Sequence, residues 1–396
     1  MSKEYFTLDE IEGDRMLLRP DINLPLEKDL EIADDTRIRE IIPTIEKICE
    51  RSSLVILAHQ SRPGKWDFTS MEKHASRIEK LTSISVKFVD DVFGKKAKEA
   101  IENLDGGILV LDNVRGCEGE QDLKTPEEHS KNPLVQELYP LFDGFVIDAF
   151  SAAHRAHCSF MGFTWVLPSA SGSAMRGELA AMEKALNEPG KPFLVILGGA
   201  KYEEIPRIIP RLFERGVDKV ALVGVPGNLF LRAIGKSIGG PFTQDQIKEA
   251  RRTYAKYSGK IELPCDVAFG KRVRTEAEVD SLDGEVVPLD IGERSVEELN
   301  GLIQRAHTTI ISGPAGVYED ERFAAGTKRL LHSIAKSDTY SLAGGGHTSS
   351  AINLFDVEGF SHVTTAGGAF ETCLEGDGLP VVEALKANFR RFGGRS

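Results

Sequence analysis

The stretch of the sequence with the clearest chemical potential is FVIDAFSAAHRAH, residues 145–157. An apolar run there is followed closely by His154, Arg155 and His157. Runs of this kind are typical of buried strands in a parallel sheet. Three similar runs in the first half of the chain are also followed by arginine or histidine. The side chains at those ends are Arg19, His59, Arg62 and Arg115.

Ligands of open α/β sheets bind beyond the carboxyl ends of the strands, so these basic groups are expected to converge on one cleft. Any one of them alone is more typical of a solvated or ion-paired surface. Guanidinium groups bind phosphate and carboxylate oxygens in pairs. Asp21 and Asn23 follow one of these strands, and Arg37 follows an acidic pair at the expected start of a helix. The pattern predicts a pocket for a small, multiply charged anion.

Glycine-rich turns replace the basic ends in the second half of the chain. Such turns let backbone N–H groups approach a phosphate, and the helix that follows adds a favourable dipole. Five such turns in one domain, one of them carrying Lys201, suggest a nucleotide. The turns are GGAK (198–201), VGVPG (223–227), SGPAG (312–316), AGGGHTSS (343–350) and TAGGA (365–369).

The common nucleotide fingerprints are absent from the sequence. No GxGxxG follows a first strand, which disfavours a dinucleotide dehydrogenase. FLRAIGKS (230–237) ends like a P-loop, but Phe230 stands where the first glycine belongs and the residues between look helical. We therefore do not interpret it as a Walker A motif.

Composition excludes several classes of function. The chain has 396 residues, a formal net charge of −12 and 41% hydrophobic residues. That acidity argues against broad binding of nucleic acid or of an anionic membrane, and no run approaches the length of a membrane span. The start of the chain resembles no signal peptide, and the five cysteines are widely spaced. We expect a cytoplasmic protein with reduced thiols.

Apolar runs alternate with amphipathic segments along the chain, which predicts an α/β fold with parallel sheets. The runs in the second half include IELPCDVAF (261–269) and EVVPLDIG (285–292). We predict one domain over residues 1–170, an interdomain helix within 171–190 and a second domain over 191–379. An amphipathic helix is predicted over 380–396.

Across nearly its whole length the chain resembles phosphoglycerate kinases, most closely those of archaea. The matching motifs occur in the family's order and with its spacing, which makes the resemblance very specific. They are LRPDINLP, DDTRIREIIPTI, LAHQSRPG, DAFSAAHRAH, FLVILGGAK, SGPAGVYE, RFAAGTKRL, AGGGHTSSA and HVTTAGGA.

The resemblance implies two Rossmann-like α/β domains joined by a hinge, with the C-terminal helix packed back on the first domain. It implies reversible phosphoryl transfer between 1,3-bisphosphoglycerate and ADP, giving 3-phosphoglycerate and ATP. Arg37 and Lys201 would be catalytic. The substrate would be bound by Asp21, Asn23, Arg37, His59, Arg62, Arg115 and Arg155. The nucleotide would be bound by Gly198, Gly199, Lys201, Glu319, Gly344, Gly345, Gly346, His347 and Thr348.

The resemblance also implies Mg²⁺, brought with the nucleotide. Mg²⁺ prefers oxygen ligands and keeps several waters, whereas imidazole suits softer metals. We therefore expect His347, which stands where many relatives have aspartate, not to bind the metal. It would instead contact nucleotide phosphate or shape the turn; the alternative is a histidine that is merely exposed. No direct side-chain ligand of the metal is predicted.

The sequence departs from the usual family pattern on the nucleotide side. Ile205 stands where many members have a second lysine, with Arg207 two residues on, and Ala366 replaces a glycine. Phe370 fills a position that is usually small and polar. The main hypothesis is an active kinase. The alternative is a degenerate paralogue that binds phosphoglycerate without turnover.

Overall fold

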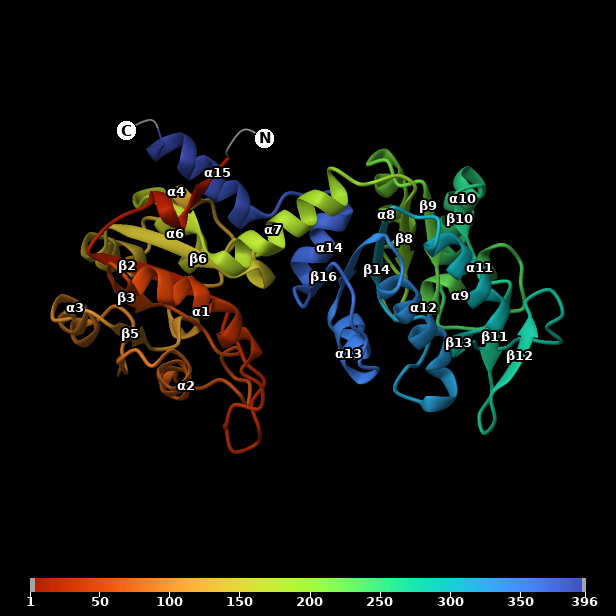
Figure 1. Ribbon diagram of the computed structural model, residues 1–396, viewed down its shortest axis with the longest axis horizontal. Helices are drawn as coiled ribbons and strands as arrows, with labels where there is room; N and C mark the ends of the chain where they lie inside the picture. Colours follow the sequence, from red (N-terminus) through yellow and green to blue (C-terminus); the bar gives the residue numbers. More distant parts are fainter. Residues whose placement is uncertain (1–3, 394–396) are drawn as a thin grey trace. The chain divides into compact units, whose positions relative to one another are not determined.

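The computed structural model describes residues 4–393, which divide into two compact units. Unit 1 comprises residues 4–179 together with 378–393, and unit 2 comprises residues 180–377. Helix α7 (Ser173–Leu186) begins in unit 1 and ends in unit 2. Each unit is built around its own parallel sheet (Figure 1).

Unit 1 contains a parallel sheet in the order β1-β7-β6-β2-β3-β5-β4. Its strands are β1 (Phe6–Thr7), β2 (Arg15–Pro20), β3 (Ser53–Ile56), β4 (Val86–Val89), β5 (Ile108–Leu111), β6 (Gly144–Asp148) and β7 (Ser169–Ser171). Its α-helices, besides the first part of α7, are α1 (Thr36–Cys49), α2 (Glu72–Thr82), α3 (Lys95–Glu102), α4 (Pro126–His129), α5 (Pro133–Leu138), α6 (Cys158–Val166) and α15 (Pro380–Phe392).

The sheet of unit 1 is apolar on both faces, because its strands carry nearly continuous runs of buried residues. Met16 and Leu18 of β2 pack with the buried isoleucines of α1 and with Ile78 of α2. On β6, Phe145 contacts Phe163 of α6, with ring centroids 5.3 Å apart. Helices therefore cover both faces and leave the carboxyl edge of the sheet to the loops.

The C-terminal helix α15 belongs to unit 1 and packs against α6 and β7 (Figure 1). Asn388 fixes it: its amide donates to the carbonyls of Thr164 and Leu167 at 2.6 and 2.8 Å, and its Oδ1 accepts from the Ser169 N–H at 2.9 Å. The helix ends at Phe392, and the last part of the predicted helix, residues 394–396, lies outside the described residues.

Unit 2 contains a parallel sheet in the order β10-β9-β8-β14-β15-β16. Its strands are β8 (Phe193–Leu197), β9 (Lys219–Leu222), β10 (Ile261–Glu262), β14 (Thr308–Ser312), β15 (Tyr340–Gly344) and β16 (His362–Thr364). The helices around it, besides the end of α7, are α8 (Ile205–Glu214), α9 (Gly224–Ala233), α10 (Gln244–Tyr257), α11 (Glu293–Ile303), α12 (Ala325–Ala335), α13 (Gly346–Leu354) and α14 (Gly367–Glu375).

Two runs that we expected in the parallel sheet of unit 2 lie largely outside it. IELPCDVAF divides at Pro264 into β10 and β11 (Asp266–Phe269), and EVVPLDIG supplies only β13 (Asp290–Ile291). With β12 (Thr275–Glu278), the strands β11 and β13 form a separate antiparallel sheet. The physical reason is proline, which has no N–H for a central strand and so interrupts both runs.

Candidate active site

The predicted anion site lies at the carboxyl edge of the sheet in unit 1. Strands β6, β2, β3 and β5 are neighbours in that order, so the loops that follow them share one edge. These loops carry the predicted residues; α1 adds Arg37 from its first turn. The sheet order explains why side chains up to about 130 positions apart come together.

Asp21, Asn23 and Arg37 form a connected group. Arg37 Nη1 lies 2.8 Å from Asp21 Oδ2 and donates to the Asn23 carbonyl at 3.2 Å. Asn23 Oδ1 accepts from the Ser61 N–H at 2.8 Å, and the Ser151 hydroxyl donates to Asp21. The group therefore joins the loops after β2, β3 and β6 to the start of α1.

Arg115 is the most deeply buried of the predicted substrate-binding arginines. Its side chain is 3% exposed, and Nη1 donates to the Ser61 carbonyl at 3.2 Å. Its Nε and Nη2 are buried and meet no hydrogen-bond partner among residues 4–393. Burial, and then the nearby charges of Arg155 and Arg62, lower the pKa of Arg115, partly offset by Glu120. Buried donors without acceptors are costly, which indicates a site built for an anion.

His59 is held by a buried network. Arg19 Nη2 donates to His59 Nδ1 at 3.1 Å, so the neutral ring carries its hydrogen on Nε2. Arg19 also donates from Nε to Ser159 Oγ at 2.8 Å, and Ser159 donates to Glu120 at 2.6 Å. Burial and the neighbouring arginines hold the pKa of His59 well below 6.5. His59 can therefore donate one hydrogen bond without becoming charged.

Four of the five glycine-rich turns of unit 2 contribute to the lining of a cavity of about 360 Å³, and VGVPG (223–227) does not. At Gly198, a Cβ would lie 2.4 Å from the Pro314 carbonyl oxygen, so no larger residue fits. Gly345 has φ +96° and precedes the first residue of α13, whose N–H groups point into the turn. The predicted residues that line this cavity are Gly198, Gly199, Lys201, Gly345, Gly346, His347 and Thr348.

Lys201 is mostly exposed and is paired across this cavity. Its Nζ lies 2.9 and 3.1 Å from the two carboxylate oxygens of Glu371 on α14. Ile205, at the position of the missing lysine, begins α8 and lines the same cavity. The cationic charge on this wall is therefore supplied by a single lysine that an acidic side chain partly neutralises.

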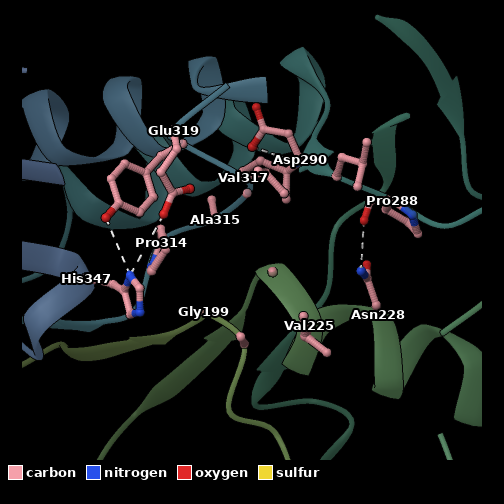
Figure 2. Close-up of a pocket in the computed structure, with 16 residues that line it drawn as sticks. Gly199, Val225, Asn228, Pro288, Asp290, Pro314, Ala315, Val317, Glu319 and His347 are labelled. Atoms are coloured by element: carbon pink, nitrogen blue, oxygen red, sulfur yellow. Dashed lines mark hydrogen bonds and ion pairs between the residues drawn. The ribbon is translucent and has the colours of Figure 1, made fainter. Parts of the chain in front are cut away.

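A second cavity, of about 170 Å³, adjoins the first and is drawn in Figure 2. Its walls are mainly apolar or backbone, with Asn228 donating to the Pro288 carbonyl at 3.3 Å. Figure 2 shows the His347 ring turned toward Glu319. His347 Nδ1 lies 3.9 Å from Glu319 Oε1 and 3.4 Å from the Tyr318 hydroxyl. His347 lines both cavities and marks their junction.

Gly344 differs from the other predicted glycines. It ends β15, and a Cβ there would lie 2.3 Å from the ring of Phe370, so this glycine makes room for that ring. Gly344 is not among the residues that line either cavity. This packing also accounts for the large side chain at position 370, which is fully buried.

Sequence reasoning missed several residues of both sites. Ser61, Gln60 and Glu371 make contacts that depend on how loops meet, and no local pattern marks them. Asp290 lines the second cavity at the end of an interrupted run. The sequence VPLD (287–290) could have indicated Asp290 as a site residue, because this aspartate also follows an apolar run.

Comparison with known proteins decides the family. The profile of the phosphoglycerate kinase family matches residues 7–377. The chain belongs to the phosphoglycerate kinase family. Phosphoglycerate kinase 1 of Methanosarcina acetivorans is 39% identical, covering 97% of this chain and 96% of its own, and the Archaeoglobus fulgidus phosphoglycerate kinase is 40% identical, covering 98% of both. A crystal structure of phosphoglycerate kinase from Pyrococcus horikoshii superimposes with a TM-score of 0.87 at 31% identity, covering 98% of this chain and 100% of that one.

These likenesses confirm the predicted family, the α/β fold class and the class of enzyme, a phosphoglycerate kinase that transfers phosphate to a carboxyl group. No finding favours the degenerate paralogue. Among residues 4–393, no helix combines the length and the apolar character that a membrane span requires.

Proposed function

We propose that this chain catalyses reversible phosphoryl transfer between 1,3-bisphosphoglycerate and ADP, giving 3-phosphoglycerate and ATP, with glycerate bound by unit 1 and nucleotide by unit 2. The observation that carries the proposal is the buried Arg115, two of whose nitrogens lack partners within the described residues. An anion with several oxygens would satisfy both. The family membership gives that anion its chemical class.

On the glycerate side, we assign the phosphate to Arg62, Arg115 and Arg155, assisted by the Nε2–H of His59. Guanidinium forks match phosphate oxygens in pairs, and the crowding of these arginines is relieved when a dianion enters. Asp21 and Asn23 would hold the carboxyl and hydroxyl end, because their oxygens can accept from the hydroxyl.

On the nucleotide side, the glycines of the larger cavity and the first turn of α13 would receive the phosphates. Backbone N–H groups and the helix dipole favour negative charge there. Lys201 would meet the phosphates after it leaves Glu371, and Glu319 would accept from the ribose hydroxyls. Thr348 Oγ1 already accepts from the Gly313 N–H at 2.8 Å, so we assign Thr348 mainly to shaping the turn.

Arg37 and Lys201 are the proposed catalytic residues. Phosphoryl transfer passes through a loose transition state whose charge lies on the equatorial oxygens, so positioned cations do most of the work. Arg37 is only partly exposed and already oriented by Asp21. Its charge would stabilise the transferring group more strongly than either ground state.

Mg²⁺ would accompany the nucleotide. Within residues 4–393, no group of three histidine, cysteine or acidic side chains is placed to hold a metal ion. The ion would be carried largely by the phosphates and water, and the carboxylate of Glu371 would accept a hydrogen bond from that water. When bound, the metal would neutralise phosphate charge.

The test is a coupled assay that follows ATP consumption in the presence of 3-phosphoglycerate and Mg²⁺. Turnover that requires both substrates is expected, with typical kinase values of about 1–100 per second. Absence of turnover, with 3-phosphoglycerate still binding in a calorimeter, would contradict the proposed activity.

A further inference from the structure

A buried amide connects two loops of the glycerate site. Gln60, between His59 and Ser61, is fully buried. Its Oε1 accepts from the Leu24 N–H at 2.9 Å, and its Nε2 donates to the Leu24 carbonyl at 3.0 Å. The side chain thus pairs with the backbone of Leu24 as a strand residue would, and it ties the loop after β2 to the loop after β3.

His74 on α2 adds a further hydrogen bond to this amide. Its Nε2 lies 3.1 Å from Gln60 Oε1. Because that oxygen only accepts, Nε2 must carry the hydrogen. Burial lowers the pKa of His74 to about 4, so the ring is neutral at physiological pH. Its Nδ1 is buried and meets no partner within residues 4–393, so the ring has a single anchor, the amide.

The hydrogen bonds of Gln60 with Leu24 and His74 form a clamp, and Gln60 also connects this clamp to the third loop of the site, which follows β5. Asn113 Nδ2 donates to the Gln60 carbonyl at 2.8 Å, and its Oδ1 accepts from the Arg115 N–H at 3.2 Å. Ser61, next to Gln60, is held between Asn23 and Arg115 and has φ +56°, an uncommon conformation for a residue other than glycine. A backbone kept there must be over-determined by its surroundings.

We propose that Gln60, buttressed by His74, is a positioning residue for glycerate binding. It sets the spacing between the loop of Asp21 and Asn23 and the loop of His59 and Arg62. It contacts no ligand itself, because it is fully buried beneath both loops. The inference rests on the proposed function and extends it to residues behind the pocket.

A purely structural role must be separated from positioning. Leu24 is 3% exposed, so loss of the amide leaves its N–H and carbonyl buried without partners and lowers stability in either case. A change in KM for one substrate alone is the readout that a structural role would not give. The chain offers a matched control, Asn388, another buried amide of unit 1 with three hydrogen bonds, which holds α15.

The decisive variant is Gln60→Met, which keeps the length of the side chain and removes the clamp. We expect KM for 3-phosphoglycerate to rise about tenfold while KM for ATP changes less than about twofold, because small displacements of binding groups are costly. Asn388→Leu should lower the urea midpoint by a similar amount and leave both KM values unchanged. His74→Leu should resemble Gln60→Met, and His74→Gln, which keeps a donor near the position of Nε2, should restore most of the affinity.

An unchanged KM for 3-phosphoglycerate in folded Gln60→Met would overturn the proposal, as would equal rises in both KM values. If Gln60→Met does not fold, the two His74 variants test the proposal instead. Equal KM values for 3-phosphoglycerate in His74→Leu and His74→Gln would then contradict the proposal. Should the wild-type chain lack turnover, the proposed function fails separately. Hydrogen exchange then tests the clamp: residues 21–26 and 60–68 should both exchange faster in His74→Leu than in His74→Gln, and equal exchange would refute it.

Discussion

The two candidate binding regions are built in opposite ways. In unit 1 two basic side chains of the candidate anion site, Arg115 and His59, are buried and each is 3% exposed, whereas Arg62 is exposed. In unit 2 the cavities are shaped by glycine backbone, and the charged side chains stand in solvent: Lys201 is 84% exposed and His347 76%. The buried charges of unit 1 are therefore held in place before a ligand binds. In unit 2 the backbone of the glycine-rich turns is held in place, and the exposed charged side chains can move.

This difference has energetic consequences. Desolvating Arg115 and His59 costs free energy on folding, but their positions are then fixed and little ordering remains for binding. Lys201 stays exposed, so it loses little hydration free energy on folding. Its side chain must instead be ordered when the nucleotide binds. Substitutions in unit 1 should therefore be more damaging than substitutions of exposed groups in unit 2.

The largest effect is expected for Arg37→Ala. We predict that kcat falls by about a hundredfold or more with a smaller change in KM, because this charge matters most when the phosphoryl group is between donor and acceptor. Steady-state kinetics with both substrates varied measures it. A kcat near wild type with only KM raised would make Arg37 a ground-state binder.

Arg62→Ala and Arg155→Ala should chiefly weaken 3-phosphoglycerate binding. Each removes about 1.5–3 kcal/mol of charge-assisted hydrogen bonding, and ATP affinity should not change. Substitution of the half-buried Arg155 should weaken 3-phosphoglycerate binding more than substitution of the exposed Arg62. Calorimetric titration of each ligand distinguishes the two sides, and damage mainly to ATP binding would reverse our assignment of the two units.

Buried histidines should also make unit 1 sensitive to acid. The folded-state pKa of His74 is about 4 and the unfolded value about 6.5, so the unfolded chain binds more protons between these values. Stability must then fall as the pH falls through that window. Between pH 7 and pH 5, wild type should lose ~2 kcal/mol more than His74→Gln in urea unfolding. Equal losses of unfolding free energy in the two proteins would show that His74 does not contribute to the acid sensitivity.

The smallest effect is expected at the exposed junction of the two cavities. His347→Ala should weaken nucleotide binding by no more than about fivefold, or leave it unchanged, because an exposed contact contributes little. The Mg²⁺ concentration for half-maximal activity should stay the same at saturating nucleotide. A large rise in that concentration, with nucleotide affinity intact, would make His347 a metal ligand.

Much of this architecture could be predicted from the sequence, for a physical reason. Basic residues such as His59 and Arg115 follow apolar runs, and parallel strands place their carboxyl ends at one edge. The positions of Gln60 and Glu371 could not be predicted, because their contacts depend on how separate loops and helices meet. The misassigned runs around Pro264 and Pro288 show how a proline diverts an otherwise convincing strand.

The central claim is that the two ligands divide between the two units. Calorimetric titration of 3-phosphoglycerate and of ATP with Mg²⁺ into wild type, Arg115→Met and Lys201→Met tests it most directly. We predict a crossed pattern: Arg115→Met raises Kd for 3-phosphoglycerate at least about tenfold and spares ATP, and Lys201→Met weakens only ATP. Arg115→Met that binds 3-phosphoglycerate like wild type, or loses ATP instead, would contradict the account.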